Sequence, residues 1–261
     1  MKISLFPLTT VTTALLMGVL PLTAWANYVP PPGLGLPGPR EGAGTRGCVF
    51  GNPGSLTLLM PESNVGWTTA AYPQFHWYTP LNVASFVEFT LYSANPEDES
   101  DRTQVYQSRF TVSGDAGIAS LQLPADSGLP PLEVGQLYYW QVAIFCNANS
   151  ESGELKAGGW VERQETDTVL AAALAEAAEA EVPELYAVNG YWFDAVDSLM
   201  ARRQAHPEDE AVQAQWMDLL DSVGLASLAE QPLFSDAPVI DAVVLDCLDL
   251  SVLNNLPLAT E

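Results

Sequence analysis

The sequence predicts an α+β protein in which an antiparallel β-sandwich is followed by a small helical region. Two observations lead to this prediction. Apolar and polar residues alternate in short runs between residues 55 and 163, a pattern typical of strands. From residue 166 the alternation stops and alanine becomes frequent, which favours helices.

Seven segments show the strand pattern, and turn signals separate them. They are 55–60, 74–78, 85–92, 104–112, 117–123, 137–145 and 159–163. Segment 137–145 is the most apolar, so we expect it to be central in its sheet. Short strands in this number are typical of an antiparallel sandwich, which we place over residues 48–165.

The stretch from Leu132 to Trp140 resembles the turn and tyrosine that open the sixth strand of immunoglobulin-like and fibronectin-like sandwiches. In those folds the tyrosine hydroxyl bonds to the backbone of the preceding turn. The resemblance therefore implies that Tyr138 bonds to the turn just before it.

Helix signals follow from residue 166 to residue 234. Thr166 and Asp167 can cap a first helix, and Pro183 suits the first turn of a second. Pro207 ends a helix pair, and Gly224 closes a further helix over 211–223. The spacing of small and aromatic residues between 186 and 195 resembles one tetratricopeptide-type hairpin. A single hairpin of this kind cannot bury its own apolar face, so it must pack on other helices or on the sandwich.

The two ends of the chain differ from the middle. Residues 1–26 combine Lys2, an apolar run and the small-x-small site Ala24-Trp25-Ala26, which indicates a cleaved signal peptide. Residues 27–47 form a Pro/Gly-rich strap, and 235–261 form an acidic and apolar tail that is either disordered or adds a strand. We therefore expect an exported protein, periplasmic or extracellular, with no membrane span after signal cleavage.

Charge narrows the range of partners. The chain has 9 Lys+Arg and 32 Asp+Glu, a net charge of −23. Such a polyanion repels nucleic acid and anionic lipid. Solubility alone accounts for the charge, and basic partners or divalent cations are the alternatives.

Three cysteines are present, and an exported protein usually pairs them. Cys48 and Cys146 flank the predicted sandwich, so we expect a disulfide between them. It would close a loop of about a hundred residues, worth up to ~4.7 kcal/mol in the chain-entropy model. Free buried thiols are the alternative. Cys247 lies in the tail, and its state is left open.

The run LPGPREGAGTRGC at 36–48 raises the question of a phosphate-binding loop. It lacks the lysine and the preceding strand that such loops require. We interpret it as a structural strap in which Arg40 and Arg46 pair with acidic residues, with anion binding by the same arginines as the minority hypothesis.

Several segments in the right order resemble a family of cyanobacterial genomes described as "domain of unknown function 928". The segments are 36–47, 60–62, 72–75, 131–135, 139–140, 144–146, 159–163, 192–195, Trp216 and 219–220. The likeness covers roughly residues 36 to 234 and implies no activity. The adjacent arginines expected after Pro-Gly are replaced by Pro39-Arg40.

Catalytic signatures are missing. The sequence has no G-x-S-x-G and no H-E-x-x-H, and it has only two histidines. We expect His76 to be a packing residue and His206 to be solvated. The acidic loop 96–101 lacks calcium-loop spacing, so we expect no metal and no cofactor.

Two functions remain. The first is a non-enzymatic interaction module of the cell envelope that binds a protein through an apolar groove at Trp192, Phe193 and Trp216. The second is a carbohydrate-binding or carbohydrate-acting wall protein with clustered exposed tryptophans. For that surface we assign Trp77 and Trp140 to the core and leave Trp67 and Trp160 open.

Overall fold

The structure is a computed structural model of the 261-residue chain. It describes residues 27–32, 35–36, 38–42, 48–51, 54–95, 98–150, 155–234 and 239–244, the last of these as backbone only. The expected signal peptide over 1–26, Arg46, Cys247 and the tail beyond 244 lie outside the described residues.

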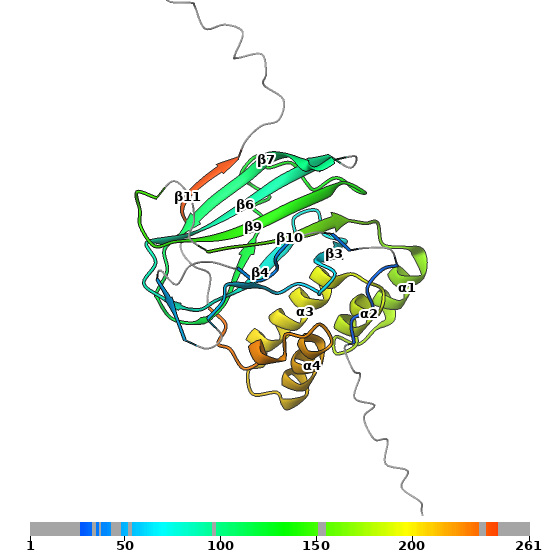
Figure 1. Ribbon diagram of the computed structural model, residues 1–261. Helices are drawn as coiled ribbons and strands as arrows, with labels where there is room; N and C mark the ends of the chain where they lie inside the picture. The colour runs from blue at the N-terminus through cyan, green and yellow to red at the C-terminus, as the bar shows by residue number, and fades with distance from the viewer. Residues whose placement is uncertain are drawn as a thin grey trace, which may run out of the picture.

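The strands form three sheets (Figure 1). The large sheet has the order β11-β7-β6-β9-β10-β3, made by Val239–Val244, Asp98–Phe110, Phe86–Asn95, Leu137–Phe145, Leu155–Arg163 and Val65–Thr68. The small sheet has the order β2-β4-β8, made by Thr57–Leu58, Gln74–Thr79 and Gly117–Gln122. A two-stranded ladder pairs β1, Val49–Phe50, with β5, Leu81–Asn82.

All seven predicted strands are present, and β9 lies inside the large sheet as expected. The prediction missed β1, β3 and β5, which have two to four residues and are too short to show alternation. It was also wrong on one pairing, because β3 runs parallel to β10. The large sheet is therefore mixed, and an immunoglobulin-like strand order is not confirmed.

Aromatic side chains join the large and small sheets face to face. Phe75 of β4 contacts Phe89 and Trp140, with ring centroids 5.1 and 4.8 Å apart. Trp77, two residues further along β4, contacts Phe89 and Phe110. Successive side chains on a strand point to opposite faces, so this spacing places both rings of β4 in the same core. The predicted core positions of Trp77 and Trp140 are confirmed by exposed fractions of 2% and 0%.

The expected tyrosine contact is also present. The backbone N–H of Glu133 donates to the hydroxyl oxygen of Tyr138 at 3.0 Å. This bond ties the loop before β9 to the strand itself, five residues further on.

The strap lies along one lateral side of the two sheets. The N–H of Gly158, at the edge of the large sheet, donates to Pro39 O. Toward the small sheet, Leu58 N–H donates to Arg40 O and Gly42 N–H donates to Leu56 O. Residues 38–42 thus bridge the two sheet edges, and the strap interpretation is supported there.

The disulfide between Cys48 and Cys146 is present, with Cα atoms 5.5 Å apart. It connects the residue before β1 to the residue after β9. The N–H of Val83 donates to Cys48 O at 2.9 Å, so the β1–β5 ladder is held beside this link.

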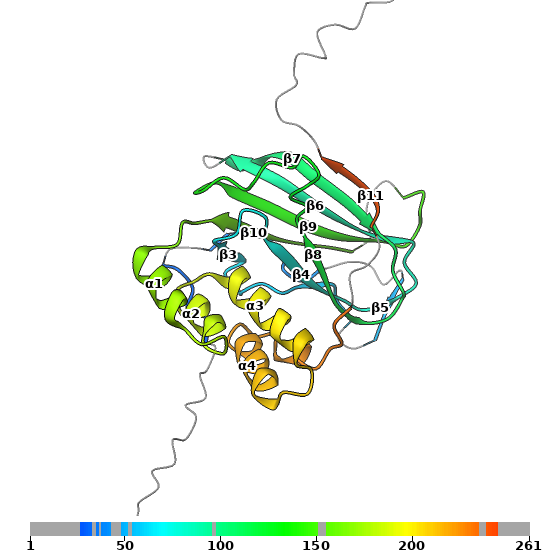
Figure 2. The same cartoon turned by 180° about the vertical axis from the view of Figure 1, so that it is seen from behind.

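Four helices follow β10 in the order expected (Figure 2). They are α1 Thr168–Glu176, α2 Val182–Val188, α3 Trp192–Ala205 and α4 Glu210–Asp221, and the short 3₁₀ turn η1, Ala226–Leu228, comes after them. The carboxylate of Asp167 accepts from two N–H groups in the first turn of α1, as a cap should. Pro183 lies in the first turn of α2, and Gly224 after α4 has a φ of +73°.

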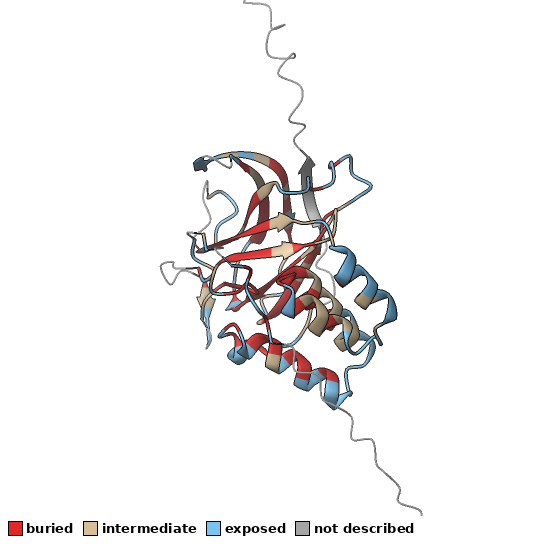
Figure 3. Ribbon diagram, turned by 90° about the vertical axis from the view of Figure 1, so that its right-hand side faces the viewer, coloured by how far each residue is buried: buried red, intermediate tan, exposed pale blue. Residues whose placement is uncertain are grey.

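The helices cover the outer face of the small sheet and form a third layer (Figures 1 and 3). Their buried sides face the sheets, and their exposed sides, α1 above all, face outward (Figure 3). A single core cluster contains residues of both sheets and of α2, α3 and α4. The boundary between 48–165 and 166–234 is therefore a change of layer and not a gap between separate cores. Of the tail, 239–244 pair antiparallel with β7 as β11.

Candidate functional site

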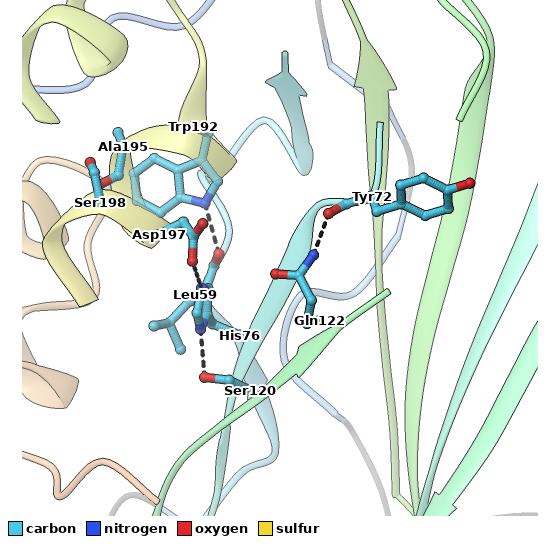
Figure 4. Close-up of polar contacts among 9 residues, drawn as sticks. All are labelled: Leu59, Tyr72, His76, Ser120, Gln122, Trp192, Ala195, Asp197 and Ser198. Atoms are coloured by element: carbon cyan, nitrogen blue, oxygen red, sulfur yellow. Dashed lines mark hydrogen bonds and ion pairs between the residues drawn. The ribbon is translucent and has the colours of Figure 1, made fainter. Parts of the chain in front are cut away.

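The expected partner groove at Trp192, Phe193 and Trp216 does not exist as a surface. Their exposed fractions are 0%, 3% and 1%. The indole N–H of Trp192 donates to Leu59 O at 2.7 Å (Figure 4), and the ring of Phe193 meets Phe75 edge-on at 5.4 Å.

Trp216 is held inside the helical layer. Its indole N–H donates to Ala229 O at 3.1 Å, and the guanidinium of Arg203 lies 5.4 Å from its ring centroid. The groove prediction failed because the three aromatic side chains have a partner inside the chain. They fill the seam between helices and small sheet and the interior of the helical layer.

Arg40 has a structural contact that differs from the expected one. Its guanidinium donates to Met60 O at 3.1 Å and to Val223 O at 2.7 Å. These acceptors are carbonyls of the β2–β3 loop and of the segment after α4, not carboxylates. Arg40 therefore ties the strap to a sheet loop and to the helical layer. Arg46 lies outside the described residues.

The described tryptophans do not make an exposed aromatic surface. Trp160 has an exposed fraction of 0% and packs against Tyr139 at 5.0 Å. Trp67 is half-buried, and its indole N–H donates to Glu162 at 3.1 Å. The clustered exposed tryptophans expected of a carbohydrate surface are thus absent from the described part of the chain.

The arrangement that most resembles a catalytic triad consists of His76 of β4, Ser120 of β8 and Asp197 of α3 (Figure 4). Nδ1 of His76 lies 2.8 Å from the Ser120 hydroxyl oxygen, and Nε2 lies 3.7 Å from an Asp197 carboxylate oxygen. In serine hydrolases the serine meets Nε2 and the carboxylate meets Nδ1, the reverse of this order. The His76 side chain is only 2% exposed.

This placement has a structural consequence. His76 and Ser120 are directly opposite each other on neighbouring strands, and both side chains project from the side of the small sheet that α3 covers. The imidazole is enclosed between sheet and helix, where it links β8 through β4 to α3. The expectation that His76 is a packing residue agrees with its burial.

Asp194 makes a second link between α3 and the sheets. Its carboxylate accepts hydrogen bonds from the backbone N–H and the hydroxyl of Thr69, the residue after β3. Burial raises the pKa of the Asp194 carboxyl, and the hydrogen bonds from Thr69 oppose that rise.

A cleft of about 490 Å³ opens between the sheets on the side away from the strap. Its apolar lining includes Trp77, Phe110 and Phe234, and its polar lining includes Asn82 and Asp115. Sequence analysis missed it because its walls come from four separate segments. Phe110 and Phe234 alone carry no sequence signal that they would meet.

An exposed apolar strip lies beside this cleft on the β1–β5 ladder. Phe50, Leu81 and Val83 have exposed fractions of 50%, 46% and 70%. Phe50 and Leu81 are direct cross-strand partners. We call these three residues the β1–β5 strip. The run Leu81-Asn82-Val83 after Pro80 was the available signal, but it is too short to separate a surface ladder from a core strand.

Among the residues that the structure describes, no group of three or more His, Cys, Asp or Glu side chains is placed to hold a metal ion. Within the same residues, no helix combines the length and apolarity needed to cross a bilayer.

Comparison with known proteins identifies the family and nothing more specific. No curated protein matches the chain. Residues 41–233 match the family described as Domain of Unknown Function (DUF928). This match spans most of the 261 residues and contains the small sheet, the large sheet except β11, the disulfide and the helical layer. The chain belongs to the DUF928 family.

Proposed function

We propose that this chain is a non-enzymatic, exported interaction module of the cell envelope, and that the β1–β5 strip is its protein-binding surface. One observation carries the proposal. Three of the eight large exposed hydrophobic side chains among the described residues lie together here: Phe50 and Leu81 in the ladder and Val83 directly after β5. Neighbouring exposed apolar side chains of this kind mark interaction sites more often than scattered ones do.

The backbone under the strip is held in place. Cys48 precedes the ladder and is joined to Cys146, and Val83 donates to Cys48 O. Asn82 N–H donates to Gly114 O at 2.8 Å on the other side. A surface that is ordered before binding loses little conformational entropy when a partner arrives.

The charge of the chain selects the partner. A net charge of −23 repels acidic proteins and attracts basic ones over a Debye length. Asp115 is exposed one residue after Gly114, next to the strip. We therefore propose a partner with apolar side chains surrounded by basic ones.

An immunoglobulin-like sandwich with a tetratricopeptide-like hairpin is the fold prediction that accompanies this function.

The test uses the chain from Asn27 as bait against an envelope extract of the source cell. A captured protein is identified, purified and bound again in isolation. We expect Phe50→Ser with Val83→Ser to weaken that binding by at least about tenfold, the loss of two apolar contacts. Val169→Ser is the matched control, because Val169 is 79% exposed on α1, away from the ladder.

Two results would overturn the proposal. In the first, Val169→Ser weakens the binding as much as the strip variant does. In the second, the chain is retained on a polysaccharide bait, binds no protein, and is unaffected by the strip variant. That result would favour the carbohydrate alternative. Circular dichroism of each variant shows whether a loss comes from unfolding.

A further inference from the structure

The cleft between the sheets is built as a small-molecule site and is separate from the β1–β5 strip. Its volume of about 490 Å³ falls within the range of about 300–1,000 Å³ typical of ligand pockets. Trp77 and Ala119 line it from the small sheet, and Val87 and Phe110 line it from the large sheet. Its floor is therefore the edge of the aromatic core.

The third wall comes from the segment after η1. Ile118 N–H donates to Pro232 O, and Phe234 N–H donates to Ile118 O, both at 2.8 Å. Residues 232–234 thus extend the edge of β8 and present Leu233 and Phe234 to the cleft. A Cβ on Gly117 would lie 2.6 Å from the Phe234 ring, so only glycine at 117 permits this wall.

The polar lining of the cleft carries a single charge, that of Asp115. The other polar lining residues are neutral: Thr79, Asn82, Thr111, Ser113 and Ser120. No lysine or arginine lines the cleft among the described residues. An anionic ligand would meet the Asp115 carboxylate without a cation to offset it, in a chain whose net charge is −23.

We propose that this cleft binds a small, uncharged and mostly apolar molecule, with its apolar part against Trp77, Phe110 and Phe234 and any polar group toward Asn82 and Asp115. Burial of apolar surface against Trp77, Phe110 and Phe234 supplies most of the affinity. The proposal stands independently of protein binding by the strip.

The experiment uses two fluorescent probes with the same ring system. N-phenyl-1-naphthylamine is uncharged, and 8-anilino-1-naphthalenesulfonate carries one added sulfonate. Each is titrated into the chain from Asn27, with probe emission and tryptophan quenching as readouts. We expect saturable binding of one uncharged probe per chain, at least about tenfold tighter than binding of the anionic probe.

Variants locate the bound probe. Val112 is half-buried and lines the cleft, so Val112→Trp should fill its mouth and weaken the uncharged probe by about tenfold or more. Ala119→Leu fills the same space from the floor and serves if Val112→Trp does not fold. Val83→Ser, on the strip, is the matched control and should leave probe binding unchanged. Asp115→Asn should strengthen only the anionic probe.

The outcomes are distinct. Non-saturating binding, or binding that both filling variants leave intact, would overturn the cleft as a site. Loss of the probe on Val83→Ser would show adsorption to the strip instead. Equal binding of the two probes would overturn the preference for an uncharged ligand. None of these results depends on whether a protein partner is found.

Discussion

The two lateral sides of the sheet pair are closed in different ways. On the strap side, residues 38–42 make backbone hydrogen bonds to β10 and to the small sheet. On the opposite side, residues 232–234 bond to β8, residues 239–244 pair with β7, and a cleft of about 490 Å³ remains between the two sheets. One continuous run of residues bridges both sheets on the first side, whereas two separate runs bond to one sheet each on the second.

Side-chain size explains the difference. On the strap side, a Cβ on Gly42 would lie 3.2 Å from Lys156 O and 3.3 Å from Leu56 Cβ, so the strap fits because it is glycine there. On the open side, Phe110 and Phe234 stand between the backbones. The strap side thus holds the two sheets together, and the cleft side has the space that the proposed ligand needs.

The largest expected effect concerns the disulfide, which lies beside the β1–β5 ladder. Replacing Cys48 and Cys146 together by serine should lower the free energy of unfolding by about 2–5 kcal/mol, because the unfolded chain regains the freedom of a long loop. Urea denaturation measures this free energy. Cys247→Ser is the control for loss of a thiol. An unchanged midpoint in the double variant would show that the disulfide does not stabilise the fold.

The second largest loss of stability is expected for Arg40→Met. Arg40→Met removes two charge-assisted hydrogen bonds, to Met60 O and Val223 O, and leaves both carbonyls short of a donor. We expect a loss of about 2–3 kcal/mol, from the usual range for such bonds. Arg40→Lys keeps the positive charge but lacks the guanidinium group. Its free energy of unfolding should lie between those of the native chain and Arg40→Met. If Arg40→Met matches the native chain, Arg40 does not couple the strap to the helical layer.

The next prediction concerns the pH dependence of stability and Asp194, which joins the helical layer to the sheets. Burial raises the pKa of its carboxyl above the ordinary 3.8, so the folded state keeps this proton to higher pH than the unfolded chain. Its contribution to stability is fully present below pH 3.8 and is lost as the pH rises through the raised pKa.

Asp194→Asn should therefore remove this contribution to the decline in stability with rising pH. Urea titrations at pH values from about 3 to about 7 measure the decline, starting just below the ordinary pKa of an aspartate. Glu210→Gln on α4, whose side chain is exposed, is the control. A decline equally steep in Asp194→Asn would assign it to other groups.

The smallest effect is expected on the open side. Val112→Trp places a larger side chain at the mouth of an existing space, so the free energy of unfolding should change by about 0.5 kcal/mol or less. Denaturation beside Arg40→Met gives the direct comparison of the two sides. A loss above about 2 kcal/mol would mean that the cleft is more tightly packed than its volume indicates.

Local signals were enough for most elements. Alternation located seven of the strands, and Asp167, Pro183 and Gly224 marked helix ends where the structure has them. These signals act within a few residues, so no tertiary information is needed. The disulfide also followed from the position of its cysteines at the two ends of the strand region.

The partner of each apolar face was decided by the tertiary structure alone. Periodicity shows that Trp192 and Phe193 lie on an apolar face, but it does not say whether that face meets a second protein or the chain's own sheet. Here α3 covers the side of the small sheet that carries His76, and Phe193 of α3 also reaches Phe75 and Trp140 in the core between the sheets. The same limit hid the β1–β5 strip, whose side chains look like core residues in sequence.

What the amino-acid sequence determined by itself was seven strands and the helices, the strap, the disulfide and the acidic character of the chain. The three layers, the parallel β3–β10 pair, the carbonyl contacts of Arg40 and the cleft were decided only when distant segments met. Secondary structure depends on residues within one turn or one strand, whereas burial depends on which surfaces remain after the layers have packed.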